Sequence, residues 1–487
     1  MLDFRPVLLV IGIFVAMFGA LMLIPMLADL VSGDPDWRAF GLSALLAGGF
    51  GGGLTAASWG RIESISARQG FLVTTLSWLA LVLVASVPLM LGSMELSFTD
   101  AFFEAMSGLT TTGATVVVGL DDAPRGFLLW RSILQWIGGV GVVIMAIALL
   151  PFLSVGGMQL FRLESSDQSD KILPGASQIA TAITSLYVTF TVLCFLSYRA
   201  MGMNAFDALN HAMTTIATGG YSTRDASFGY FLSDPNIRGP IDLVATFFMI
   251  MGALPFGVYL LMLRGRLNAF GNDAQVRFFL AAAATFILIV GTRIVSALDF
   301  DTFTGFRYAA FNVVSVMTGT GYATTDYGLW GSFAAGFFFC IMFVGGCAGS
   351  TSCGLKIFRL QVAFAALWVY ARRLAHPHRI VTARYNGQAI TDDVFLSVMS
   401  FAFAYFTCFA TIAVLLSLFQ LDAVTALSAA GSAIANVGPG LGPIIGPAGN
   451  YASLVAPVKW ILAFAMLLGR LEIFTVLVLL APGFWRR

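Results

Sequence analysis

The chain alternates long apolar runs with short polar stretches. The first run, residues 7–28, has 22 residues and no charge before Asp29. At about 1.5 Å of rise per residue, a helix of this length crosses the ~30 Å hydrocarbon core of a bilayer. Similar runs recur to the end of the chain, and we expect ten spans, near residues 7–28, 39–58, 71–92, 127–150, 178–200, 241–263, 276–297, 333–355, 394–419 and 457–481. The pattern predicts an all-α membrane protein.

Four shorter segments lie between pairs of these spans and are too short and too polar to cross, at residues 100–115, 207–222, 307–323 and 422–439. We expect each to be a helical turn or two that ends in a glycine-rich piece. The segments resemble one another, because those that begin at Asp100, Asp207 and Asp422 all open with Asp-Ala. The third fits least well, since it begins at Arg307. Aligning the ends of the segments equates Gly113, Gly220, Gly321 and Gly438.

This internal repeat divides most of the chain into four units of span, short segment and span (M1–P–M2). The units occupy residues 70–151, 177–266, 274–357 and 393–487, after two N-terminal helices in 1–69 and with a basic cytoplasmic loop at 358–392. Two spans plus a segment that dips in and returns bring the chain back to its starting side. We therefore expect parallel, pseudo-symmetric repeats around a central pore. The alternative, four amphipathic helices on the membrane surface, does not explain Thr/Gly clusters at one offset.

Composition narrows the class of protein further. Hydrophobic residues make up 58% of the chain and charged residues 10%, against about 25% charged in a soluble domain. A soluble enzyme, a nucleic-acid binder and a fibrous protein are excluded. Three histidines in the whole chain supply little for general acid–base work, so we do not expect an enzyme. The five cysteines imply no disulfide framework, and we expect them to act as small packing residues.

The distribution of charge predicts the orientation in the membrane. With the N-terminus in the cytoplasm, 16 Lys and Arg residues fall on the inner side and 9 on the outer side, and Arg470 lies within a span. Acidic residues are more frequent on the outer side. The positive-inside rule then favours a multi-pass membrane protein with ten crossings and both termini cytoplasmic. All four short segments would enter from the outer face.

The ends of the dipping segments have the composition of a cation pathway. Non-helical backbone is tolerated at membrane depth only where it is buried in protein or lines water. A ring of carbonyl oxygens from four such loops can replace the hydration shell of an alkali cation, and the helix before each loop adds a partial negative charge at its C-terminus. No titratable side chain occupies the loop tips.

Five acidic residues lie near the expected entrances of the dipping segments. These residues are Glu104, Asp121, Asp122, Asp225 and Asp326. We expect them either to concentrate cations near the mouth of the pathway or to belong to solvated extracellular loops.

The loop sequences resemble a known family. TTTGATV at 110–116, TIATGGYST at 215–223, TGTGYATTD at 318–326 and AIANVGPG at 433–440 are similar, in this order, to the pore loops of the Trk/Ktr/HKT superfamily of potassium transporters, most closely its bacterial Trk-type membrane subunits. The resemblance covers essentially the whole chain. It implies K+ as the transported ion, no bound organic cofactor, and a selectivity filter made of Thr111, Thr112, Gly113, Thr218, Gly219, Gly220, Gly319, Thr320, Gly321, Asn436, Val437 and Gly438.

Glycine in all four repeats implies a preference for potassium. The fourth repeat departs most from the filter of a potassium channel, so we expect a less symmetric and less selective site. Two other features are expected to gate the path. Span 333–355 is interrupted by GGCAGSTSCGLK, which is either a flexible helix packed through small residues or, as the resemblance implies, an obstructing intramembrane loop. The gate residues would be Gly345, Gly346, Gly349, Ser350, Thr351, Ser352, Gly354, Lys356 and Arg470.

Arg470 is costly at membrane depth, by at least about 2.5–3.5 kcal/mol on insertion scales. We expect it to face the pore as a barrier to cations, as the resemblance also implies, and the alternative is a pair with an acid on another helix. Glu472 would point to a different helix face, which makes a local pair unfavourable.

The basic loop 358–392 fits contact with anionic headgroups of the lipid bilayer, or docking of a soluble subunit. The resemblance implies a cytosolic, TrkA-like regulatory subunit that binds NAD and ATP beneath a homodimer. The rival function is a secondary transporter of a small organic solute with discontinuous helices, which predicts inverted repeats. The sequence leaves open whether ion flow is passive and channel-like or a symport coupled to H+ or Na+.

Overall fold

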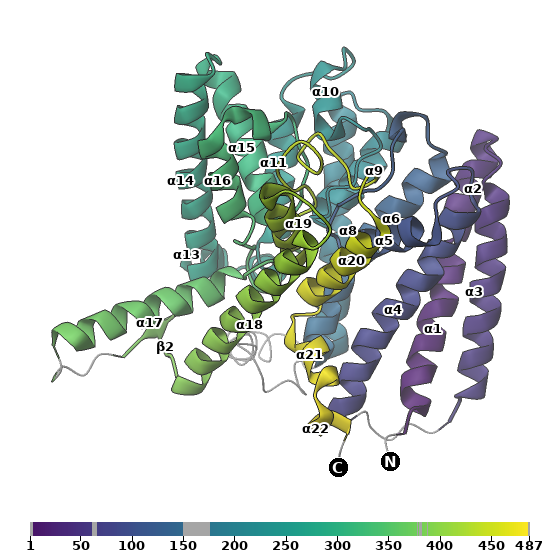
Figure 1. The fold of residues 1–487 in the computed structure, drawn as a ribbon, viewed down its shortest axis with the longest axis horizontal. Helices are drawn as coiled ribbons and strands as arrows, with labels where there is room; N and C mark the ends of the chain where they lie inside the picture. Colours follow the sequence, from purple (N-terminus) through teal and green to yellow (C-terminus); the bar gives the residue numbers. More distant parts are fainter. Residues whose placement is uncertain are drawn as a thin grey trace.

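The computed structural model describes residues 3–60, 66–149, 176–376, 378, 382–386 and 388–485. Within these ranges the chain is almost entirely helical (Figure 1). Six of the basic residues that we assigned to the inner side lie outside the described residues, namely Arg61, Arg162, Lys171, Arg379, Arg486 and Arg487. Six described segments are long and apolar enough to cross a membrane, and two bent helix pairs bring this number to eight.

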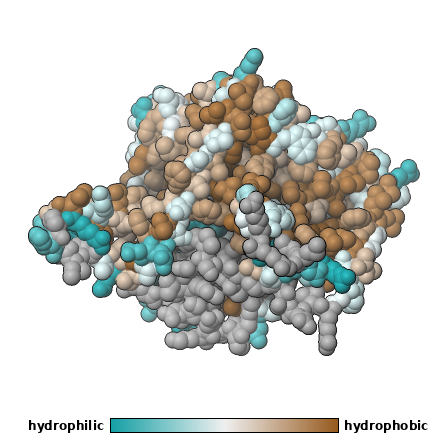
Figure 2. Space-filling model, turned by 60° about the horizontal axis from the view of Figure 1, so that its bottom comes forward, coloured by the Kyte–Doolittle hydropathy of each residue, from teal (hydrophilic) through white to brown (hydrophobic). Residues whose placement is uncertain are grey.

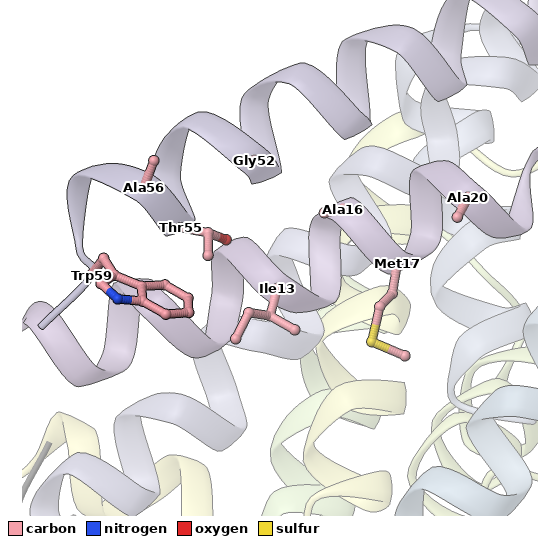
Figure 3. A pocket seen from close by; sticks show the side chains of 8 residues that line it. All are labelled: Ile13, Ala16, Met17, Ala20, Gly52, Thr55, Ala56 and Trp59. Atoms are coloured by element: carbon pink, nitrogen blue, oxygen red, sulfur yellow. The ribbon is translucent and has the colours of Figure 1, made fainter. Parts of the chain in front are cut away.

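The N-terminal helices form a hairpin beside the rest of the molecule. They are α1 (Arg5–Leu21), which continues into α2 (Leu23–Ser32), and α3 (Trp37–Ala57). A Cβ atom on Gly51 would overlap the backbone of α1 at Ala16, so α1 and α3 cross with their backbones in contact. An apolar groove of about 790 Å³ lies between α1 and α3 and runs from Ala20 to Trp59 (Figure 3).

The four predicted units follow in order. The first is α4 (Ala67–Leu91), α5 (Phe98–Leu109) and α6 (Arg125–Leu149), and the second is α8 (Ala176–Ala200), α9 (Ala205–Ile216), α11 (Ile241–Ala253) and α12 (Phe256–Leu263). The third is α14 (Ala274–Ala297), α15 (Thr302–Thr318) and α16 (Ser332–Ile341), and the fourth is α18 (Asp392–Ser417), α19 (Ala423–Ala435), α20 (Ala456–Arg470) and α21 (Phe474–Leu480). The second helix of each unit, namely α5, α9, α15 and α19, is called its pore helix below.

The short elements connect these helices. They are η1 (Leu120–Asp122), η2 (Ser227–Gly229), α10 (Tyr230–Ser233), α13 (Asn268–Asn272), η3 (Tyr327–Trp330), α17 (Ile357–Ala375), β1 (Arg384–Tyr385), β2 (Gln388–Ala389) and α22 (Pro482–Trp485). The strands β1 and β2 pair antiparallel. Phe484 of α22 and Val7 of α1 belong to one buried apolar cluster, so the start of α1 and the last helix lie at the same end of the molecule (Figure 1).

Two predicted spans are bent rather than straight. The span predicted at 241–263 breaks between α11 and α12, with an angle of 92°, and the span predicted at 457–481 breaks between α20 and α21, with an angle of 114°. Pro255 lacks an amide hydrogen and explains the first break. The second break contains Glu472, whose φ of 55° lies in the left-handed region. No proline or glycine in 471–473 signals it in the sequence.

The segment that we predicted as a cytoplasmic loop, 358–392, is helical over most of its first half. There α17 continues the chain directly after the interrupted third unit and projects sideways from the body (Figure 1). Seen from the lower end, hydrophobic residues cover much of the upper part of the surface, and hydrophilic residues gather along its lower and outer edges (Figure 2). This separation is typical of a protein that sits in a bilayer.

Candidate functional site

The four pore helices begin in the same way. Each N-cap side chain accepts a hydrogen bond from the backbone N–H three residues later, and the caps are Ser97, Asn204, Asp301 and Asp422. In the two aspartates, the neighbouring hydroxyl-bearing side chains of Thr304 and Thr425, and the hydrogen bonds from the backbone N–H groups of these threonines, lower the pKa of the carboxyl.

These caps correct two expectations. Asp422 occupies the position of Ser97 and Asn204, whereas Asp100 and Asp207 lie three residues further into their helices. The shared Asp-Ala opening of the fourth segment is therefore out of register with the first two. The pore helices are also longer than a turn or two, with 12, 12, 17 and 13 residues.

The four loops after these helices follow one backbone path. In each, the glycine equated by the sequence alignment has a positive φ, and so does the residue two positions before it. The pairs are Thr111 (53°) and Gly113 (86°), Thr218 (48°) and Gly220 (77°), Gly319 (72°) and Gly321 (81°), and Asn436 (55°) and Gly438 (105°). Three of the first members are not glycine, and such a residue at positive φ is uncommon. The predicted alignment of the four glycines is thus the structural one.

The loops also meet edge to edge. A Cβ atom on Gly113 would overlap the carbonyl oxygen of Gly219 in the second loop. The same relation links Gly220 to Thr320, Gly321 to Val437 and, closing the circle, Gly438 to Thr112. The four backbones therefore form a ring in chain order, and only glycine fits at these four contacts. All twelve predicted filter residues lie in this ring.

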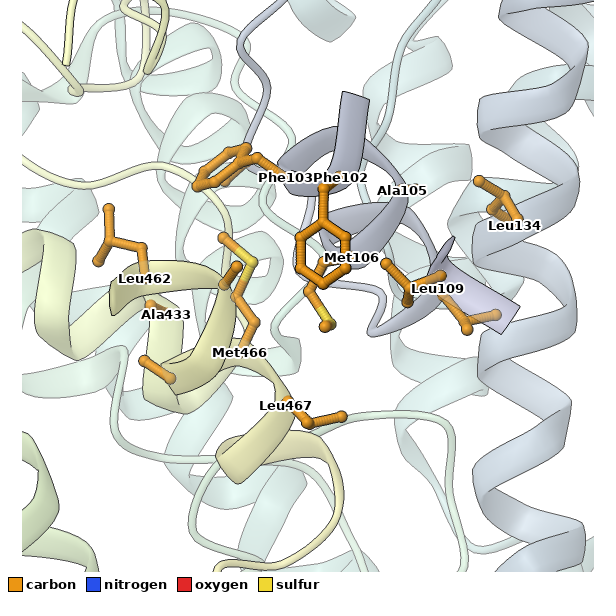
Figure 4. Close-up of a cluster of buried hydrophobic side chains, with 14 of the residues drawn as sticks. Phe102, Phe103, Ala105, Met106, Leu109, Leu134, Ala433, Leu462, Met466 and Leu467 are labelled. Carbon is orange, nitrogen blue, oxygen red and sulfur yellow. The ribbon is translucent and has the colours of Figure 1, made fainter. Parts of the chain in front are cut away.

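Glycines on the following helices allow the ring to be enclosed tightly. Cβ atoms on Gly138 of α6, Gly252 of α11 and Gly469 of α20 would each come too close to the carbonyl oxygen four residues before the filter glycine of the same unit, which belongs to Leu109, Ile216 and Ile434 respectively. Around these contacts the packing is apolar. Met466 and Leu467 of α20 lie against Met106 and Leu109 of α5, so the fourth unit is joined to the first (Figure 4).

Each of the first three pore helices braces its loop with a polar side chain nine residues before the filter glycine. The Nε2 atom of His211 lies 3.0 Å from Ser222 Oγ, and Asn312 Nδ2 donates to Thr324 Oγ1 at 2.7 Å. In the first unit this residue is Glu104, which accepts from Thr115 Oγ1 and from the backbone N–H of Val116. The loops are thereby held from behind by their own helices.

Glu104 corrects a third expectation. It is fully buried and forms an ion pair of 2.8 Å with Arg131 of α6, so it neither lines the mouth nor belongs to a solvated loop. The helical phase of α5 turns this side chain towards α6 instead. Asp225 is at the surface, where it accepts hydrogen bonds from the backbone of Gly119 and Leu120. Asp121 is also exposed and lies 3.4 Å from Arg224.

The loop that interrupts the third unit, residues 342–356, contacts the ring at Thr218 through Thr351 and is called the gate loop here, after its predicted role. Thr351 is fully buried, and its hydroxyl donates to the carbonyl oxygens of Ile216 and Gly252, both at 3.0 Å. The backbone N–H of Cys347 donates to Ala253 O, next to the break between α11 and α12. The gate loop is thus docked on the second unit.

Most of the remaining residues predicted for the gate form contacts within the loop. Gly346 N donates to Ser352 Oγ, Ser350 Oγ donates to Cys347 O, and Lys356 Nζ donates to Ser352 O. Gly345 and Gly354 meet at the base of the loop, where a Cβ on Gly345 would overlap the backbone of Cys353. Gly349 has a φ of 74° and its carbonyl accepts from Phe256 N.

Arg470, at the end of α20, is 2% exposed and reaches the gate loop. Its guanidinium donates to Thr351 O at 3.2 Å, to Cys353 Sγ at 2.6 Å and to Gly138 O at 2.6 Å. Among the described residues, no carboxylate lies within ion-pair distance of Arg470, and Glu472 instead pairs with Arg359 at 2.7 Å. Cys353, which we expected to be a packing residue, is therefore a hydrogen-bond partner of a buried charge.

Residues 46–486 match the family described as TrkH, a cation transport protein. The chain belongs to the TrkH family. It is 46% identical over 488 residues to the Trk system potassium uptake protein TrkI of Halomonas elongata, a match that covers 99% of this chain and 97% of that protein. Its identity to the Trk system potassium uptake protein TrkH of Escherichia coli K12 is 36% over the whole length of both chains.

The fold is also that of a solved member of the TrkH family. The crystal structure of the potassium transporter TrkH from Vibrio parahaemolyticus covers the whole of both chains with a TM-score of 0.91 and 32% identity. The predicted fold class is confirmed, with two N-terminal helices followed by four units of helix, pore helix and helix.

Several residues around the ring were not expected from the sequence. Arg131 and Gln135 of α6 are both fully buried and both contact the second loop, and His211 and Asn312 brace the second and third loops. A signal for the first pair was visible, because two polar residues four apart share one face of a predicted span. Polar side chains inside a membrane segment normally face partners in the protein interior.

Proposed function

We propose that this chain takes up potassium ions across the bacterial inner membrane through the ring formed by the four loops. The observation that carries this proposal is the closed ring of backbone at Gly113, Gly220, Gly321 and Gly438. Carbonyl oxygens in such a ring can replace the water around a monovalent cation. The names of the relatives, which are potassium uptake proteins of the Trk system, point to K+ as that ion.

The same proposal assigns the gate. In it, the gate loop and Arg470 obstruct the path below the filter, and ions pass when they move. The hydrogen bonds of Thr351 and Arg470 give the two a common closed position. A cytosolic, TrkA-like subunit that binds NAD and ATP would control the movement from below a homodimer whose termini face the cytoplasm. The basic segment around α17, with Arg372 and Arg373 exposed, offers such a subunit a surface.

The rival function, a secondary transporter of an organic solute, is less well supported. Two broken helices, α11–α12 and α20–α21, favour it. It predicts inverted repeats, however, whereas each filter glycine here meets the carbonyl of the next unit in the same sense around the ring. Parallel units around one axis suit an ion pathway.

The experiment that tests this function is ion flux from the purified chain in liposomes. Gradients of K+, Rb+, Na+ and Li+ would be compared, with protein-free liposomes as the control. We expect flux of K+ and Rb+ to exceed that of Na+ and Li+. Equal flux of all four ions, or none of any, would contradict the proposal.

A further inference from the structure

The helix α6 differs from its counterparts in what it presents to the ring. Gly138, Gly252 and Gly469 mark equivalent points on α6, α11 and α20, because each packs on the same carbonyl of its own pore helix. Three residues earlier, α6 has Gln135 where the others have Met249 and Met466. Seven residues earlier it has Arg131, where they have an alanine and a leucine, Ala245 and Leu462. Of these three helices, α6 is therefore the one with polar residues at these positions.

Gln135 forms hydrogen bonds to the second filter loop through both the nitrogen and the oxygen of its amide. Its Nε2 donates to the carbonyl oxygen of Gly219, and its Oε1 accepts from the backbone N–H of Tyr221 at 2.9 Å. The side chain is fully buried. A methionine thioether has no donor and is only a weak acceptor, so Met249 and Met466 cannot hold the next loop in this way.

The same contact explains the extra glycine of this loop. Gly219 precedes the filter glycine, where the other loops have Thr112, Thr320 and Val437. Its φ is not in the left-handed region, so the backbone does not require glycine there. A Cβ on Gly219 would instead lie 2.5 Å from Cδ of Gln135. The glycine is needed because the glutamine amide lies against the backbone.

Arg131, one helical turn before Gln135 on α6, also contacts this loop. It donates to Ser222 O at 2.9 Å, and its guanidinium lies 4.0 Å from the centre of the Tyr221 ring. The Tyr221 hydroxyl in turn donates to Glu104 O at 2.8 Å. Residues 219–222 are therefore fixed by α6 at successive points.

We propose that Gln135 is a positioning residue for ion selectivity, which fixes the Gly219 carbonyl by hydrogen bonding to it and weakens the field that this carbonyl offers to an ion. The inference rests on the proposed function of the ring. A carbonyl oxygen that already accepts from an amide has less electron density for a cation. A weaker field favours the larger, more weakly hydrated ion, so this contact favours K+ over Na+ at the level of the ring formed by residues 112, 219, 320 and 437.

The test is the ratio of K+ to Na+ flux in liposomes for Gln135→Met, which installs the residue of the other units at nearly the same volume. One net hydrogen bond corresponds to about a three- to tenfold effect, so we expect the ratio to fall by this factor while K+ flux persists. The matched control is Met249→Leu, which changes the equivalent side chain without touching a hydrogen bond. Its ratio should equal that of the wild type.

A second variant separates positioning from simple support of the fold. In Gln135→Glu, a carboxylate can still accept from Tyr221 N–H but places a second acceptor against Gly219 O. We expect its ratio to fall as in Gln135→Met, and this variant decides the question if Gln135→Met does not fold. If the wild type favours K+ over Na+ and the variants have the same K+/Na+ flux ratio, the inference about Gln135 is wrong and the proposed function is unaffected. A wild type without preference for K+ overturns the proposed function as well.

Discussion

The hydroxyl of Thr351 lies 3.2 Å from the hydroxyl of Thr218, so the tip of the gate loop touches the ring itself. Thr218 is the residue at positive φ that begins the second filter loop. The same Thr351 hydroxyl also donates to Ile216 O and Gly252 O. Any displacement of the gate loop away from the ring must break this cluster of contacts.

Thr351→Val removes these hydroxyl contacts at almost constant volume. Each net hydrogen bond contributes about 0.5–1.5 kcal/mol, so loss of two should favour the displaced loop by about tenfold or more. We expect K+ flux in liposomes without any partner subunit to rise accordingly. Ser350→Ala is the control, because among the residues that the structure describes Ser350 Oγ bonds only within the loop, to Cys347 O. Equal flux in wild type and Thr351→Val would show that the loop is not held by these contacts.

Arg470→Ala should also raise flux without the partner. A positive charge 4 Å from a monovalent cation opposes it by about 4 kcal/mol at an effective dielectric constant of 20, so the increase should exceed tenfold. Arg470→Lys keeps the charge and is expected to stay close to the wild type. If the alanine variant conducts no better than the lysine variant, Arg470 acts through its bonds to Gly138 O and Thr351 O, as a structural link and not as a barrier.

Gly321→Ser tests the ring. The backbone there has a φ of 81°, which costs a side chain roughly 1–3 kcal/mol, and a Cβ would overlap Val437 O of the neighbouring loop. The loops must separate, and we expect the K+/Na+ flux ratio to fall by about tenfold. Gly113→Ser should act in the same direction through Gly219 O. Gly271→Ser, at a helical glycine with open space around it, is the control. An unchanged ranking of ions in both filter variants would contradict the assignment of the filter.

The sequence predicted the ring well because the ring depends on local backbone geometry. A positive φ followed by a close approach of another backbone requires glycine, and this requirement leaves a visible mark at Gly113, Gly220, Gly321 and Gly438. The long apolar runs were equally visible, since the bilayer thickness fixes their length.

Other features depend on partners far away in the chain. Glu104 was assigned to the mouth because its acidity was visible but its buried partner Arg131, 27 residues later, was not. The bend after Arg470 occurs at residues with no helix-breaking character, so tertiary contacts decide it. The bond of Cys353 to Arg470 joins the third unit to the fourth, and no local pattern could have indicated it.

The buried pair of Glu104 and Arg131 gives a prediction about stability. Glu104→Gln leaves Arg131 without a counter-charge in a site where both side chains are almost completely buried, and breaking such a pair costs about 3–5 kcal/mol. The melting temperature of the purified protein in detergent should fall markedly. The control is Asp121→Asn, since Asp121 forms an exposed pair with Arg224 at 3.4 Å and such pairs contribute about 0–1 kcal/mol.

The double variant Glu104→Gln, Arg131→Met distinguishes the effect of the two buried charges from the effect of the other contacts of Arg131. Removing both charges relieves the uncompensated burial and should recover part of the melting temperature. Recovery should be incomplete, because Arg131 also donates to Ser222 O and lies on the Tyr221 ring. Full recovery would mean that the pair acts only through its own charges and does not hold the second loop. A single variant as stable as the wild type would mean that water reaches the pair and that the first two loops are joined less tightly than the buried contacts imply.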